Sequence, residues 1–245
     1  MVSLRPPTPA FMTAKAILDE LRPLGRESYK KVMRNHGVPE PFFGVKIEEL
    51  KKIQKRIKQD YQLALDLYET GNYDAQYLAG LIADDARMTK RDLQRWAEQA
   101  CEPLSGCIVP WVAAGSPHAR EIALEWVDSG KDLVAAAGWA TLGGLVALKE
   151  DADLDLAGLK QLLQRVQQKI HTAPNKVRYA MNGFVIAVGS YVPSLTALAR
   201  QTGEKIGPVT VDMGNTACQV PFSPDYIDKV AQRGTIGKKR KTVKC

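Results

Sequence analysis

The strongest constraint on the fold is that predicted helices of two kinds follow one another. In segment 155–171, leucine, valine and isoleucine residues recur at helical spacing on one side, and the other side is polar. The next segment, 174–190, is apolar over most of its length. Stacked helix pairs produce this alternation, because the outer helix of each pair stays half exposed while the inner helix is covered on several sides.

Segments with helical periodicity continue along most of the chain. They occupy residues 10–22, 26–36, 47–59, 61–70, 73–84, 89–101, 106–114, 117–128, 131–149, 155–171, 174–190 and 193–203. Comparable helices recur after about 40 to 45 residues, which is typical of HEAT-like units. The sequence therefore predicts an all-α fold, a curved α–α superhelix of HEAT-like or armadillo-type repeats over residues 1–205.

The last forty residues break this pattern. Residues 206–224 are rich in glycine and proline, which predicts an extended loop or short hairpin, and a helix follows near 225–233. We expect residues 206–233 to pack on the end of the array, and 234–245 to form a basic, flexible tail. Four polar residues of the loop are expected to form turns, with a ligand site as the alternative. These residues are Asp212, Asn215, Thr216 and Cys218.

The positive charge is concentrated at the C-terminus. The chain has 245 residues and a formal net charge of +7. Six of its 34 lysines and arginines lie in residues 231–245, which contain no acid, so the other 28 are balanced by 27 acids. The tail thus indicates a polyanionic partner, whereas a basic surface on the body requires that charges gather on one face.

Cysteine usage and hydropathy limit the other possibilities. Four cysteines are too few for a disulfide framework, and Cys101 and Cys107 lack further ligands for zinc, so we expect no metal and no cofactor. The uncharged run 179–199 is long enough to span a bilayer, but Pro193 and several polar residues interrupt it. We therefore expect a buried helix, no membrane partner and a cytoplasmic protein, associated with the nucleoid if the source is bacterial.

One stretch carries a family resemblance. Residues 29–47 read Tyr-Lys-Lys-Val-Met-Arg-Asn-His-Gly-Val-Pro-Glu-Pro-Phe-Phe-Gly-Val-Lys-Ile. They resemble the signature of the DNA alkylation repair (AlkD-like) HEAT-repeat family, and the similarity covers about residues 20–200, strongest at 29–56. The resemblance implies a helical scaffold that binds DNA in its concavity and excises N3- or N7-alkylated purines.

The chain departs from the family where the family carries its catalytic residues. Family members have two adjacent tryptophans followed by an aspartate within one helical turn, and the matching stretch here is 95–101. Trp96 matches a tryptophan, whereas the aspartate position falls on Ala100 or Cys101. Excision passes through an oxocarbenium-like sugar that a carboxylate stabilises, and neither residue supplies a carboxylate.

Two further family positions are also altered. The arginine of a later inner helix falls near Ala136, and the second tryptophan of the concavity falls near Gly183 or Phe184. A displaced acid, Glu98 or Glu102, is a weak candidate for the catalytic carboxylate, with Trp96 and Trp139 as aromatic walls. We favour ordinary exposed or paired glutamates, since carboxylates on helices are usually solvated. The other tryptophans, Trp111, Trp126 and Trp139, are expected in the core.

Candidate DNA-binding cations lie on one predicted helix. Lys51, Lys55 and Lys58 in segment 47–59 point away from its apolar stripe. Like charges four residues apart repel, so a phosphate backbone is a natural counterpart. A solvated charged face that also bears Glu48 and Glu49 is the alternative.

Two other groups complete the predicted DNA contacts. On the inner helix 174–190, Arg178 and Asn182 are expected to face the concavity, with satisfaction of neighbouring carbonyl groups as the alternative. The tail residues Lys238, Lys239, Arg240 and Lys241 are expected to grip phosphates without sequence preference. The alternatives for the tail are a nuclear localisation signal, if the source is a eukaryote, and a segment that only aids solubility.

Three functions stay open from the sequence. The favoured one is a DNA-binding relative of the alkylation repair glycosylases that recognises damaged or distorted DNA with weak or no base excision. The second is an active N3/N7-alkylpurine DNA glycosylase that uses a displaced glutamate. The third is a protein-interaction scaffold, which the nearly neutral body permits. The expected partner is duplex DNA, damaged and branched forms included, bound by a monomer.

Overall fold

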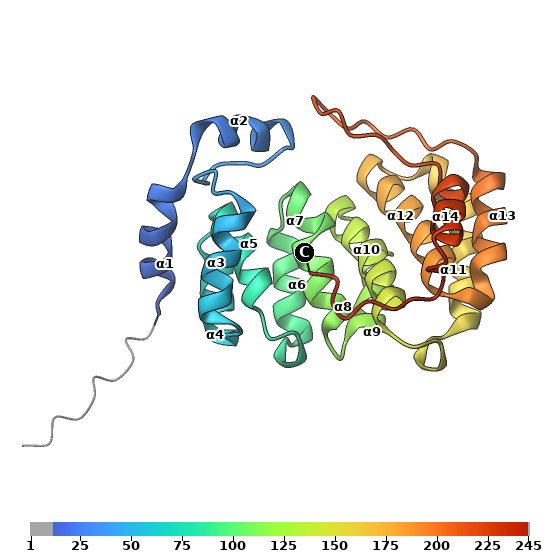
Figure 1. The fold of residues 1–245 in the computed structure, drawn as a ribbon, viewed down its shortest axis with the longest axis horizontal. Coiled ribbons are helices and arrows are strands. Elements are labelled where there is room, and N and C mark those ends of the chain that lie inside the picture. Colours follow the sequence, from blue (N-terminus) through green and yellow to red (C-terminus); the bar gives the residue numbers. More distant parts are fainter. Residues whose placement is uncertain (1–11, 245) are drawn as a thin grey trace, which may run out of the picture.

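The computed structural model describes residues 12–244, and within this range the regular elements are all helical. The helices stack side by side into an array, as Figure 1 shows. The predicted all-α architecture of HEAT-like repeats is confirmed. No single helix of the described range is long and apolar enough to cross a membrane. One pair, Asn175–Tyr191 with Pro193–Ile206, has the length and composition together but is bent by 117°.

The N-terminal half holds nine α-helices and two short 3₁₀ helices among the described residues. They are α1 (Ala14–Leu21), η1 (Arg22–Leu24), α2 (Glu27–Asn35), α3 (Ile47–Ile57), α4 (Tyr61–Glu69), α5 (Tyr73–Ile82), η2 (Asp85–Arg87), α6 (Lys90–Gln99), α7 (Glu102–Gly106), α8 (Ile108–Gly115) and α9 (Ala119–Trp126). The predicted segment 106–114 corresponds to α8, and the sequence pattern missed the short helix α7 before it.

The C-terminal half contains the longest helices. Its elements are α10 (Asp132–Leu148), η3 (Asp151–Asp153), α11 (Leu156–Lys169), η4 (Ile170–Thr172), α12 (Asn175–Tyr191), η5 (Pro193–Leu195), α13 (Thr196–Ile206) and α14 (Ser223–Gln232). Helix α14 packs against α12 and α13, at the end of the array. Residues 207–222 form neither helix nor strand, so the structure shows the extended loop and not a hairpin of paired strands.

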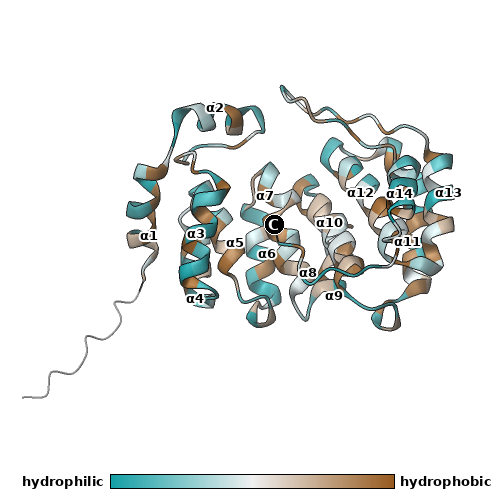
Figure 2. Cartoon of the chain, viewed as in Figure 1, coloured by the Kyte–Doolittle hydropathy of each residue, from teal (hydrophilic) through white to brown (hydrophobic). Residues whose placement is uncertain are grey.

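The alternation of outer and inner helices follows the hydropathy of the sequence. Hydrophilic residues dominate α3 and α6, whereas α8 and α10 are mostly apolar (Figure 2). Inner helices α10 and α12 pack on each other, and the rings of Trp139 and Phe184 meet edge to face with centroids 5.3 Å apart. Gly138 permits the close approach of α9 to α10, since a methyl group at this position would lie 2.7 Å from the backbone nitrogen of Val127.

The segment that resembles the family signature holds α2 in place above the array. The buried carboxylate of Asp74 on α5 accepts three backbone N–H groups, from Phe43 at 2.6 Å, Gly44 at 3.1 Å and Val45 at 2.9 Å. Burial raises the pKa of Asp74, and the three N–H donors oppose that rise. Much of the signature therefore has a structural role, since it holds this part of the chain to α5.

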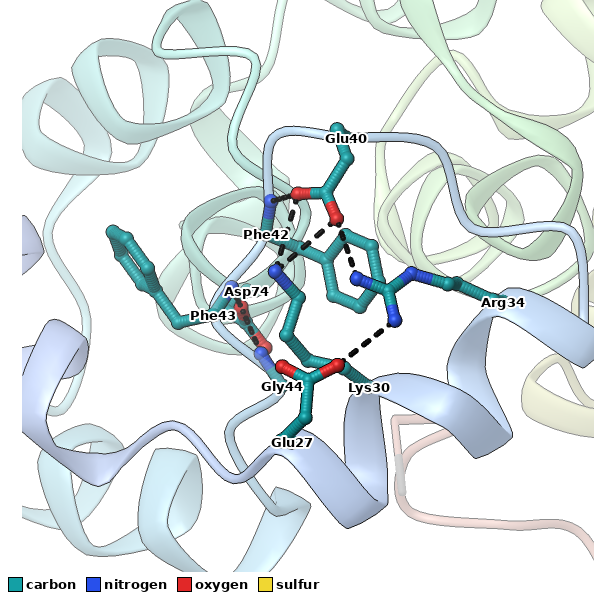
Figure 3. A network of polar contacts seen from close by, with 8 residues as sticks. All are labelled: Glu27, Lys30, Arg34, Glu40, Phe42, Phe43, Gly44 and Asp74. Atoms are coloured by element: carbon teal, nitrogen blue, oxygen red, sulfur yellow. Dashed lines mark hydrogen bonds and ion pairs between the residues drawn. The ribbon is translucent and has the colours of Figure 1, made fainter.

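A second network links the signature to α2 itself. The carboxylate of Glu40 accepts hydrogen bonds from Lys30 and Arg34, and the Lys30 ammonium lies 4.7 Å from the ring centre of Phe42. The bond from Lys30 is the largest cause that lowers the pKa of Glu40. Figure 3 shows both networks, with Glu27, Lys30, Arg34, Glu40, Phe42, Phe43, Gly44 and Asp74 as sticks.

Candidate nucleic-acid interface

A groove of about 1070 Å³ crosses the inner helices of the array. Helices α2, α3, α5, α7, α8, α10 and α12 contribute to its lining, together with residues 212–216 and two residues of the C-terminal segment. Small side chains make up its floor, because α10 and α12 turn alanines and glycines toward it at helical spacing. These residues are Ala136, Ala140, Gly143, Gly144 and Ala147 on α10, and Ala180, Gly183 and Ala187 on α12.

Aromatic side chains form one wall of the groove. Tyr73 and Tyr77 of α5 lie one helical turn apart, with ring centroids 6.3 Å from each other. Trp111 of α8 meets Tyr77 edge to face at 6.1 Å, and it is half-buried, not fully buried as expected from the sequence. Trp126 and Trp139 are buried as expected, although Trp139 also belongs to the lining. Sequence reasoning did not single out Tyr73 and Tyr77, and their four-residue spacing was the available signal.

Few charged side chains line the groove. Glu102 at the start of α7 forms an ion pair with Lys176 in the first turn of α12. Arg34 on α2 is paired with Glu27 at 2.9 Å and Glu40 at 3.1 Å. In all, three cations (Arg34, Lys176 and Arg240) and three acids (Asp74, Glu102 and Asp212) belong to the lining, so it is nearly neutral and any strong attraction for phosphate must come from its rim.

Residues 207–222, here called the projecting segment, are fastened to one side of α12. Asn175 exchanges two hydrogen bonds of 2.8 Å with the backbone of Asp212. Arg178 donates to the carbonyl oxygen of Thr210 at 2.8 Å, and Asn182 donates to that of Pro221 at 2.9 Å. The segment extends from the end of α13 toward α2 in Figure 1.

These bonds correct two predicted DNA contacts. Arg178 also donates to the carbonyl oxygen of Ala173 at 3.0 Å, and Asn182 is buried. Neither side chain lines the groove, because both satisfy carbonyl groups, mostly of the projecting segment. The alternative considered for them, carbonyl satisfaction, is the arrangement found.

The tip of the projecting segment is a turn. Asp212 accepts the backbone N–H of Gly214 at 2.8 Å, and Thr216 donates to the carbonyl oxygen of Met213 at 2.8 Å. The backbone N–H of Cys218 is 3.3 Å from the Thr216 hydroxyl. These polar residues thus form turns, as expected.

The C-terminal residues are docked, which corrects the expectation of a flexible tail. Residues 237–244, here called the C-terminal strap, run along the C-terminal ends of inner helices (dark red in Figure 1). The backbone N–H groups of Gly237 and Arg240 donate to the carbonyl oxygens of Ser190 at 2.9 Å and Ala147 at 2.8 Å. Cys245 lies outside the described residues.

Two strap lysines point inward and cap helix ends. The ammonium of Lys239 donates to the carbonyl oxygens of Val146 at 3.0 Å and Tyr191 at 2.8 Å, and it lies 2.8 Å from the Asp151 carboxylate. The ammonium of Lys244 donates to Ala83 at 3.0 Å and pairs with Asp85 at 2.7 Å. Carbonyl groups at helix C-termini lack helical partners and attract cations, so both lysines satisfy structural needs.

Lys239 is consequently not a free DNA contact. Its side chain is only 10% exposed, and that of Lys244 is 13% exposed. In contrast, Lys238, Arg240 and Lys241 are exposed, and Arg240 also lines the groove. The predicted basic tail therefore divides into inward lysines that hold helices and outward cations, of which Arg240 lines the groove.

A comparison with known proteins places the chain among relatives. The family model described as DNA alkylation repair enzyme matches residues 17–199. The chain belongs to the DNA alkylation repair enzyme family. Uncharacterized proteins of Listeria monocytogenes and Listeria innocua are 32% and 31% identical over 220 residues, which cover 87% of this chain and 95% of each relative.

One solved structure is similar over nearly the whole chain. It is described as a new family of proteins related to the HEAT-like repeat DNA glycosylases with affinity for branched DNA structures. The TM-score is 0.88, the sequence identity is 35%, and the match covers 96% of this chain and all of the other. The predicted relationship to the alkylation repair glycosylases is confirmed.

The family tryptophan that this sequence retains does not reach the groove. Trp96 is 1% exposed and stacks on Tyr68 with centroids 4.1 Å apart and the rings 7° from parallel. The Tyr68 hydroxyl donates to the carbonyl oxygen of Trp96 at 2.9 Å. The prediction of Trp96 as a DNA contact is therefore wrong, because α4 and α6 enclose its ring in the core.

Two of the altered family positions lie in the groove. The resemblance places the family's arginine near Ala136 and its second tryptophan near Gly183 or Phe184, and all three of these residues line the groove. A methyl group added at Gly183 would have no atom within 4 Å. Ala100 and Cys101, where the resemblance places the family's aspartate, are not among the lining residues.

The two candidate acids lie in different surroundings. Glu98 of α6 is exposed, does not line the groove, and accepts hydrogen bonds from Gln94 and Lys131, both at 3.1 Å. The bond from Gln94, followed by that from Lys131, lowers the pKa of Glu98. Only Glu102 lines the groove, and its pairing with Lys176 is that of an ordinary bridged glutamate.

The lysines of α3 lie away from the groove. Helix α3 contributes only Ile47 and Leu50 to the lining. Lys51 is half-buried, Lys55 and Lys58 are exposed, and none of the three has an ion-pair partner among residues 12–244. They form a separate basic surface outside the groove. Within the described range, no cluster of three or more His, Cys, Asp or Glu side chains is arranged to hold a metal ion.

Proposed function

We propose that this chain binds branched DNA through the rim of the groove and does not excise bases. The relative that matches 96% of the chain, with its affinity for branched DNA structures, carries the proposal. Exposed cations of the strap, Lys238, Arg240 and Lys241, supply phosphate contacts at the rim. We place this monomeric protein in the cytoplasm, on the nucleoid if the source is bacterial.

The neutral groove supports recognition of DNA shape over general attraction to duplex. Each phosphate that a lysine or arginine neutralises releases counterions and adds about 0.9 to the salt slope of binding. A body with 28 bases and 27 acids outside residues 231–245 supplies few such contacts. Linear duplex is therefore a weak ligand, and a branch that presents several backbones to the rim is a better one.

Binding of a four-way junction and of a linear duplex with the same sequence tests the proposal. We expect the junction to bind about 10-fold more tightly, a difference of about 1.4 kcal/mol. Fluorescence anisotropy at several salt concentrations gives both affinity and slope. Equal affinities overturn the proposal, and binding that depends on neither branching nor salt indicates a protein partner instead.

Two triple variants locate the phosphate contacts. Replacing Lys238, Arg240 and Lys241 with glutamine should lower the salt slope by up to about 3. The matched variant replaces Lys51, Lys55 and Lys58 of α3 and removes the same charge outside the groove. If only the α3 variant lowers the slope, the DNA lies on that other surface and the strap is excluded as its contact.

The absence of base excision has its own test. A glycosylase needs a carboxylate beside the sugar. Three acids line the groove, and each is already engaged: Asp74 accepts three backbone N–H groups, Asp212 accepts that of Gly214, and Glu102 is neutralised by Lys176. We expect no release of 3- or 7-methylpurine from N-methylated duplex DNA. Release that disappears in Glu102→Gln would establish the glycosylase alternative.

A further inference from the structure

At one edge of the groove the two halves of the chain come close together, and one ion pair joins them. At the end of α2, the carbonyl oxygen of Asn35 would lie 3.7 Å from a methyl group placed on Gly214, at the tip of the projecting segment. A methyl group on Gly37 would lie 3.8 Å from the Glu102 carboxylate, and Glu102 is paired with Lys176 of α12. All five residues line the groove, so its N-terminal and C-terminal walls meet at this edge.

The size of the groove limits what lies inside it. Its volume of about 1070 Å³ is slightly above the range for sites that hold one small ligand, about 300–1000 Å³. A DNA duplex is wider than its own major groove of about 12 Å. A bridged space of this size therefore holds a few unpaired nucleotides and no duplex.

The lining suits bases more than phosphates. Tyr29, Tyr73 and Trp111 are half-buried in it, and Tyr179 of α12 is 44% exposed. Aromatic side chains of this kind stack with unpaired bases in proteins that bind single strands. The indole N–H of Trp139, in the floor, is buried and has no acceptor among residues 12–244.

We propose that the groove takes a short run of unpaired nucleotides from a DNA branch point. Their bases lie against the aromatic lining and the floor of alanines and glycines. Their phosphates face the exposed strap cations, of which Arg240 lines the groove. This inference rests on the proposed function and names the part of a branched DNA that enters the site.

The test compares two four-way junctions that differ only at the crossover. One is fully paired, and the other has three unpaired nucleotides, with 2-aminopurine in the central position. We expect the wild-type chain to bind the second junction about 10-fold more tightly and to quench the 2-aminopurine fluorescence on binding. Equal affinities without a fluorescence change overturn the inference.

A variant that fills the floor removes the preference without disturbing the fold. Gly183→Leu adds a side chain whose Cβ would have no atom within 4 Å, and leucine is a better helix former than glycine. We expect it to bind both junctions equally, with the affinity of wild type for the paired one. Gly130→Leu, also without neighbours within 4 Å but outside the groove, should retain the preference.

An exposed tyrosine pair gives a second comparison. Tyr179→Ala removes an aromatic ring from the groove, and Tyr226→Ala removes one of similar exposure, 46%, from α14 outside the groove. Only Tyr179→Ala should reduce the quenching and the preference for unpaired nucleotides.

The outcomes separate this inference from the proposed function. If wild type does not prefer a paired junction to linear duplex, the proposed function fails. If it does, but Gly183→Leu and Tyr179→Ala keep wild-type affinity and quenching with both junctions, only this inference fails. That second result is also the one expected of a groove that holds a protein segment.

Discussion

At the scale of single residues, two glycines of the inner helices have opposite surroundings. A methyl group at Gly138 would lie 2.7 Å from the backbone of Val127, whereas one at Gly183 faces open space. Gly138→Ala should therefore lower the free energy of unfolding by about 1–3 kcal/mol through overpacking. Gly183→Ala should raise it by about 0.5–1 kcal/mol through helix propensity. Urea denaturation of both variants checks the pair, and equal changes would contradict this account of the packing.

Asp74 is a second residue whose role depends on distant partners. Its carboxylate satisfies three buried or half-buried N–H groups about thirty residues earlier in the chain. Asp74→Ala leaves them without an acceptor and should lower the free energy of unfolding by about 3 kcal/mol or more. Asp74→Asn keeps one carbonyl oxygen and should lose less. A loss below about 1 kcal/mol for the alanine variant, measured by urea denaturation, would show that water replaces the carboxylate.

The positions of the helices could be predicted from the sequence, but the contact partners of individual side chains could not. Helical periodicity is local, so most predicted segments match observed helices within a few residues. Trp96 depends on Tyr68, and Arg178 depends on a carbonyl group of the projecting segment, 32 residues away. No local sequence pattern contains interactions between residues so far apart. The prediction of Trp96 and Arg178 as DNA contacts was wrong for this reason.

At the scale of elements, two neighbouring lysines of the strap differ in role: Lys239 is structural and Lys238 is not. Lys239 caps α10 and α12, whereas Lys238 is exposed. Lys239→Met should lower the free energy of unfolding by about 1–3 kcal/mol, since hydrogen bonds from charged donors are among the stronger ones. Lys238→Met should leave stability within about 0.5 kcal/mol of wild type. Similar stability of both variants in thermal denaturation would indicate a strap that does not hold the helices.

At the same scale, the residues that match the family and the residues that depart from it lie in different elements. Residues 29–47 position α2 through Glu40 and Asp74, and the end of α2 forms one wall of the groove. The residues with the strongest resemblance to the family therefore have a structural role. The altered positions near Ala136 and Gly183 lie where the resemblance places catalytic residues. Fold and family can therefore be predicted from the sequence, whereas base excision cannot.

At the scale of the whole molecule, the apolar core has two large parts. One part runs from Ile17 to Ala137 and the other from Ala123 to Ile227, so α9 and α10 contribute to both. The strap touches each part, since Lys244 caps α5 in the first and Lys239 caps α10 and α12 in the second. It therefore adds a connection between halves that otherwise meet mainly through neighbouring helices.

Removal of the strap should weaken the cooperativity of unfolding. In stacked helical arrays each unit contacts only its neighbours, so cooperativity depends on the interfaces between units. Deletion of residues 235–245 removes the bonds of Lys239 and Lys244 and should split a single thermal transition into two, or broaden it with a lower midpoint. The variant with glutamine at 238, 240 and 241 keeps both inward lysines and should unfold as wild type does. Calorimetry distinguishes the cases, and an unchanged single transition after the deletion would show that the strap does not couple the two halves.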